Sequence, residues 1–265
     1  MGFLIKFFIR DGIQSRRTLW LGILGLFPVG LALILRLFSS PLARQGIEAA
    51  ALFPRIGFLL FLHFLMPLVA VFIGSGLIAD EVEGRTLPYL LVRPIPRAVL
   101  VMSKALAGWL TSAVILAISI AAVHAILALP GGLDVWWGDL GEFLRILGVL
   151  LLGLAAYTAF FGMLGALLKH PVLAGLLFTF GWENMVSFFP GNVKFFTIVH
   201  YLHTLFPHMR QFQSQNIQTQ LLSFIIKTRG TAPALAIGIL VALTAVFTGG
   251  MVLVLMTREY RLDEV

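Results

Sequence analysis

The chain has no cysteine among its 265 residues, and only 12% of its residues are charged. The absence of cysteine excludes a disulfide framework and any thiolate metal or redox centre. Charged residues make up about a quarter of an average soluble domain. This chain has about half that share, is 59% hydrophobic and has a mean hydropathy of +0.98. The composition therefore predicts an integral membrane protein.

The sequence also lacks the motifs of common soluble enzymes. No glycine-rich loop ending in Gly-Lys-Ser/Thr is present to hold a nucleotide phosphate, and neither an HExxH zinc motif nor a Ser, His and Asp grouping indicates a hydrolase. We therefore expect no catalytic residue, no cofactor and no metal in this chain. The net charge is +7, but the basic residues are scattered along the flanks of apolar runs. This favours membrane-orientation signals over nucleic-acid binding.

Six apolar runs reach the length needed to cross a bilayer, which is about 20 residues for a helix. The predicted fold is therefore an all-α, polytopic membrane protein with six transmembrane helices, and residues 1–265 form a single transmembrane domain. The predicted spans are Leu19–Phe38, Ile56–Ala79, Ala98–Leu129, Phe143–Leu168, Val172–Phe189 and Ala232–Thr257. Pro67 predicts a kink in the second span.

Basic residues flank the cytoplasmic ends of membrane spans. They gather in the N-terminal segment and in the loop between the second and third spans, whereas the loop after the third span is acidic and carries Trp136 and Trp137. This asymmetry predicts that both termini are cytoplasmic and that the tryptophan loop lies outside. Membrane lipids are therefore partners of the chain, and we expect the membrane to be the cytoplasmic (inner) membrane of a prokaryote.

The first residues predict an amphipathic helix before the first span. Lys6, Arg10, Gln14 and Arg17 recur at helical spacing, opposite a face that carries Phe7 and other apolar side chains. A helix of this kind lies in the membrane interface.

Ionisable side chains inside spans are costly and are functional candidates by default. Glu183 in the fifth span and His63 in the second span are candidates for a translocation path. The alternatives are that Glu183 reaches the outer interface beside Trp182 and that His63 is hydrogen-bonded within the helix bundle.

The loop at residues 190–231 predicts a short interfacial or re-entrant helix on the outer side, because its first part is apolar but too short to cross. It carries His200, His203 and His208. Three histidines are a possible copper or zinc ligand set. Because no carboxylate or thiolate lies nearby in the sequence, interfacial histidines are the favoured interpretation.

A charged, proline-rich segment separates the second and third spans. It resembles the cytoplasmic segment that follows the second span in ABC type-2 transporter permeases. The residues that carry this resemblance are Glu81, Glu83, Gly84, Thr86, Leu87, Leu90, Leu91, Pro94, Arg97 and Lys104. The family commonly has a basic residue before the glycine, whereas here Gly84 precedes Arg85.

The resemblance implies that the chain is the membrane subunit of an exporter. Its partners are then a second permease copy and separate ATPase subunits, which bind ATP and Mg. A short cytoplasmic coupling helix follows the second span, and Glu81, Glu83 and Arg85 face the ATPase. The implied coupling residues are Asp80, Glu81, Glu83, Gly84, Arg85, Thr86, Leu87, Leu90, Leu91, Pro94 and Arg97.

Two other functions fit the residues. One is a secondary transporter or channel that works without ATP, and the other is a membrane scaffold for a larger envelope assembly. Flux without ATPase activity favours the transporter or channel, and an ATPase-free complex with envelope proteins favours the scaffold.

Overall fold

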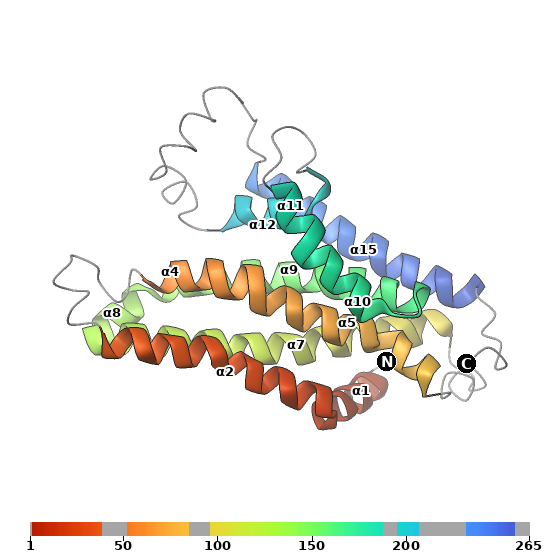
Figure 1. Cartoon of the computed structure of the whole chain (residues 1–265), viewed down its shortest axis with the longest axis horizontal. Helices are drawn as coiled ribbons and strands as arrows, with labels where there is room; N and C mark the ends of the chain where they lie inside the picture. The colour runs from red at the N-terminus through yellow and green to blue at the C-terminus, as the bar shows by residue number, and fades with distance from the viewer. Residues whose placement is uncertain (1, 39–51, 85–95, 188–194, 207–231, 258–265) are drawn as a thin grey trace.

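The structure, a computed structural model, describes residues 2–38, 52–84, 96–187, 195–206 and 232–257. Every regular element in these ranges is a helix (Figure 1), so the all-α prediction is confirmed for them. Five helical stretches are long and apolar enough to cross a membrane. They are α2 (Arg16–Leu37), the joined α4 (Leu52–Ile56), η1 (Gly57–Leu65) and α5 (Met66–Glu83), then α7 (Arg97–Ala128), α9 (Leu140–Leu167) and α15 (Pro233–Thr257).

The predicted fifth span corresponds to three short helices that follow one another without a break. These are α10 (Pro171–Leu176), η3 (Leu177–Glu183) and α11 (Asn184–Ser187). The last two residues of the predicted span lie outside the described ranges, and the stretch is not among the five candidate spans. Six crossings therefore remain a prediction.

The helices alternate between two ends of the bundle. In Figure 1, α1 (Gly2–Gln14), the start of α2, the end of α5, the start of α7 and the end of α15 lie toward one end, here named the α1 end. The short helix α8 (Leu133–Gly138), which carries both tryptophans, and the start of α4 lie at the opposite end, the α8 end. This alternation is the one that the predicted topology requires.

Two segments of the bundle, η1 and η3, are π-helical. At the end of η1, the amide of Met66 donates to the carbonyl of Phe61, five residues earlier. The ring of Pro67 would collide with the carbonyl of His63 in a regular α-helix. The wider turn that precedes Pro67 accommodates that ring, so a π-helix stands where the sequence predicted a kink.

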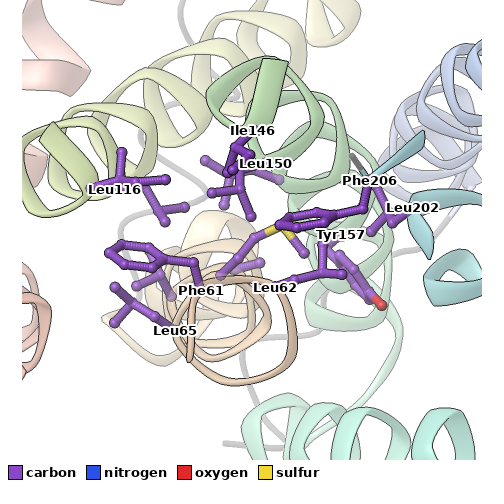
Figure 2. Packing of buried hydrophobic residues seen from close by; sticks show 14 of the residues in the cluster. Phe61, Leu62, Leu65, Leu116, Ile146, Leu150, Tyr157, Leu202 and Phe206 are labelled. Atoms are coloured by element: carbon purple, nitrogen blue, oxygen red, sulfur yellow. The ribbon is translucent and has the colours of Figure 1, made fainter. Parts of the chain in front are cut away.

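The core lies where α5 and α9 cross at close range. A Cβ atom at Gly165 would overlap the carbonyl oxygen of Ser75, and one at Gly74 would lie 2.9 Å from the carbonyl oxygen of Thr158. Larger buried side chains from several helices pack together in the core (Figure 2). The fully buried ones include Phe61, Leu62, Leu65, Leu116, Ile146, Leu150, Tyr157 and Leu202.

Candidate functional site

Two ion pairs join the spans at the α1 end. Arg17, in the first turn of α2, donates through Nη1 to Oδ2 of Asp80 at 2.9 Å and to the carbonyl of Phe72 at 3.2 Å. Lys104 of α7 donates through Nζ to Oε1 of Glu81 at 2.5 Å and to the carbonyl of Leu77 at 3.0 Å. The end of α5 is therefore tied to both α2 and α7.

The lysine of the second pair is the more buried cation. Only 8% of the Lys104 side chain is exposed, against 35% for Arg17. The Lys104 ammonium also lies 5.2 Å from the centre of the Phe8 ring, which attaches α1 to the same group. Because a buried charge without a partner is costly, Glu81 and the Leu77 carbonyl are required where Lys104 stands.

Gly76 makes the Arg17 pair possible. A Cβ atom at position 76 would overlap Arg17 Nη1 and would lie 2.6 Å from Asp80 Oδ2. The guanidinium thus lies directly against the backbone of α5. The sequence pattern placed Arg17 on one face with Lys6 and Arg10 in a helix before the first span. That placement is wrong, because α1 ends at Gln14 and Arg17 belongs to α2.

The structure describes part of the predicted coupling segment. The helix continues past Ala79 to Glu83, so Asp80 and Glu81 end the second span. Glu81 pairs within the chain, whereas the sequence predicted that it would face an ATPase subunit. Arg97 donates to the carbonyls of Leu255 and Met256, at 3.1 and 3.3 Å, and so joins α7 to the end of α15.

The rest of that segment cannot be placed. Gly84 is exposed at the end of α5, and the description does not cover the side chain of Glu83. The remaining residues of the predicted coupling segment lie outside the described ranges; they are Arg85, Thr86, Leu87, Leu90, Leu91 and Pro94.

Glu183 belongs to a second polar cluster, which joins α9, η3 and α12 (Ile198–Leu205). Glu183 is 2% exposed, whereas the adjacent Trp182 is 50% exposed. The hydroxyl of Tyr157 donates to Oε2 of Glu183, and the amide of Ile198 donates to Oε1 at 3.1 Å. Because Ile198 is the first residue of α12, Glu183 serves as a cap from a distant position. This burial differs from the interfacial alternative considered for Glu183.

His63 in η1 pairs with His203 of α12. The Nδ1 atom of His63 lies 2.9 Å from the carbonyl of Phe58, so this nitrogen carries the proton, and Nε2 accepts from Nε2 of His203 at 2.9 Å. Burial, with the nearby His63 and His200, lowers the pKa of His203 to about 3, so its ring is neutral. His63 is thus hydrogen-bonded within the bundle.

The other histidines of residues 190–231, His200 and His208, do not complete a metal site in the described structure. The ring of His200 packs against Phe195 and Tyr201, and His208 lies outside the described ranges. Among the residues that can be placed, no three His, Cys, Asp or Glu side chains form a group suited to a metal ion.

Comparison with known proteins gives one family. A family model described as "ABC-2 family transporter protein" matches residues 8–260. This range includes the two ion pairs, the Glu183 cluster and the pair of His63 and His203. No curated protein matches the chain.

Proposed function

This chain belongs to the ABC-2 transporter family, and we propose from that premise that it is the permease subunit of an ABC exporter. A separate ATPase binds ATP and Mg and supplies the energy, and the chain itself hydrolyses no ATP. A second permease copy completes the membrane part. The complex resides in the inner membrane of a prokaryote, with the α1 end and both termini in the cytoplasm.

The ion-paired end of α5 is the observation that supports this function. The predicted coupling segment begins with Asp80 and Glu81, which hold α2 and α7 through Arg17 and Lys104. A force that the ATPase applies to this segment is therefore transmitted to α5, α2 and α7. In addition, Arg97 at the far end of the segment holds α15. Glu81 contributes to coupling by positioning α7 rather than by touching the ATPase.

A charge exchange tests this role of Glu81. We expect Glu81→Lys to place two cations together, to lower the stability of the chain by about 3–5 kcal/mol and to reduce recovery of a co-expressed ATPase. The double variant Glu81→Lys/Lys104→Glu restores an ion pair of opposite polarity. It should therefore recover part of the stability, because the Leu77 carbonyl still loses the donor of Lys104. ATPase binding and ATP hydrolysis by the complex should recover with it. Co-purification and the hydrolysis rate measure the effect.

Asp134→Lys is the matched control, because this exposed acid lies in α8 at the opposite end. It should leave ATPase recovery unchanged. A double variant that folds normally but stays uncoupled would show that Glu81 contacts the ATPase directly. If the wild-type chain recovers no ATPase and transports solute without ATP, the permease assignment fails.

The proposed orientation predicts the labelling of single cysteines, which this cysteine-free chain accepts without background. Gly84 and Trp137 are both exposed. Gly84 directly follows α5 and Trp137 belongs to α8, and the end of α5 and α8 lie at opposite ends of the bundle (Figure 1). In intact cells, a membrane-impermeant maleimide should label Trp137→Cys and should label Gly84→Cys only after the cells are opened. The reverse pattern would invert the topology.

A further inference from the structure

A cavity of about 140 Å³ lies beside the two ion pairs, between α1, α2, α5 and α7. Its wall combines charged and apolar side chains. The charged ones are Arg17, Asp80, Glu81 and Lys104, and the apolar ones are Phe8, Ile73, Leu77 and Ala107. A wall of this kind suits a ligand that is itself part polar and part apolar.

Arg17 has donors left for such a ligand. A guanidinium carries five N–H donors, and both hydrogen bonds of Arg17 within the described part of the chain leave from Nη1. Its side chain is 35% exposed. The remaining N–H groups on Nη2 and Nε form the planar fork that binds a phosphate through two parallel hydrogen bonds.

The charges of the cavity favour a zwitterion over a free anion. The wall carries two cations and two anions, so an added phosphate dianion would place excess negative charge beside Asp80 and Glu81. A phosphodiester that carries its own ammonium group keeps the site neutral. The ammonium group can approach Asp80, whose side chain is 52% exposed.

The surroundings of the cavity match the membrane interface. The apolar side chains of Phe7, Leu19 and Trp20 are 56%, 60% and 70% exposed on α1 and the start of α2. The basic residues Lys6 and Arg10 are exposed on α1. Exposed apolar surface beside basic groups marks the level at which lipid headgroups meet acyl chains.

We propose that this cavity binds the headgroup of a zwitterionic phospholipid, with the phosphate on Arg17 and the ammonium group toward Asp80. The acyl chains then follow the exposed apolar surface of α1 and α2. The site requires no ATPase partner, so its test is independent of the proposed transport function.

Native mass spectrometry of the purified full chain, titrated with dioleoylphosphatidylethanolamine, tests the site. Arg17→Gln should weaken lipid binding by about tenfold, as expected when a charged, two-point hydrogen bond is lost. Gly12→Leu fills the cavity and keeps Arg17. A Cβ atom at position 12 lies 3.5 Å from Thr111 Oγ1, an ordinary contact, so the helix accepts a side chain there. This variant should also lose the lipid.

Arg16→Gln is the control, because Arg16 is exposed next to Arg17 but does not line the cavity; it should bind as the wild type does. Dioleoylglycerol, which lacks the phosphate, should not bind at this site. Wild-type binding by Gly12→Leu would overturn the proposal even if Arg17→Gln failed to fold. Equal binding of dioleoylglycerol, displacement by inorganic phosphate, or tighter binding of phosphatidylglycerol would also overturn it.

Discussion

Replacing Gly165 with leucine is expected to lower the stability of the protein by about 3 kcal/mol or more. Gly165 of α9 lies against the backbone of α5, where any Cβ atom would overlap the carbonyl oxygen of Ser75. Because the obstacle is backbone, no side-chain rotation can relieve it, and the two helices must separate. Overpacking a tight core costs about 1–3 kcal/mol and occasionally more, and we expect this variant at the upper end. Thermal unfolding followed by size-exclusion chromatography measures the loss.

Gly148→Leu is the matched control on the same helix. A Cβ atom at Gly148 meets nothing within 4 Å in the described structure. Its melting temperature should stay close to that of the wild type. Equal stability of the two variants would mean that α5 and α9 do not approach each other as described.

The second large effect is expected for Glu183→Ala, which leaves the hydroxyl of Tyr157 and the amide of Ile198 without their buried acceptor. A hydrogen bond contributes about 0.5–1.5 kcal/mol, and each buried donor left unpaired adds a desolvation cost of about 1–3 kcal/mol. We therefore expect α12 to detach from η3 and the chain to lose at least about 3 kcal/mol of stability. Hydrogen exchange at the amides of α12 reports the detachment.

Two conservative variants separate capping from transport. Glu183→Gln retains an oxygen for the Ile198 amide, and Tyr157→Phe removes one hydroxyl while keeping the ring in the core. Both should lose less stability than Glu183→Ala, and their effects should not add, because they share one hydrogen bond. If Glu183→Gln is as stable as the wild type but the complex stops transporting, Glu183 belongs to the translocation path.

The spans were predictable because lipid imposes one dominant requirement on sequence, a sustained apolar run. The long run from Ala98 to Leu129 corresponds to α7 within one residue at each end. The π-helical turns were not predictable, since a π-helix and an α-helix have the same apolar composition. Pro67 predicted an irregular helix in the second span, where η1 lies. No proline marks η3, so nothing in the sequence indicated that π-helix.

The polar clusters were visible in the sequence only as separate residues. His63 and Glu183 stood out because they are ionisable within apolar runs. Their partners His203 and Tyr157 are 140 and 26 residues away along the chain, and no local pattern connects them. Arg17 and Asp80 were likewise identified with other roles, as a surface cation and as part of the coupling segment. Only the packing of α2 against α5 at Gly76 brings them together.

The sequence separation of these pairs sets an order of events during synthesis. At about 5–20 residues per second, Arg17 leaves the ribosome several seconds before Asp80, which follows 63 residues later. The interval between the synthesis of His63 and that of His203 is longer, because 140 residues separate them. The early spans are therefore inserted before their ionic and histidine partners exist. The ion pairs of the α1 end can form once Lys104 has been synthesised, whereas the contacts that His63 and Glu183 make with α12 form only after residue 203, when most of the chain has been made.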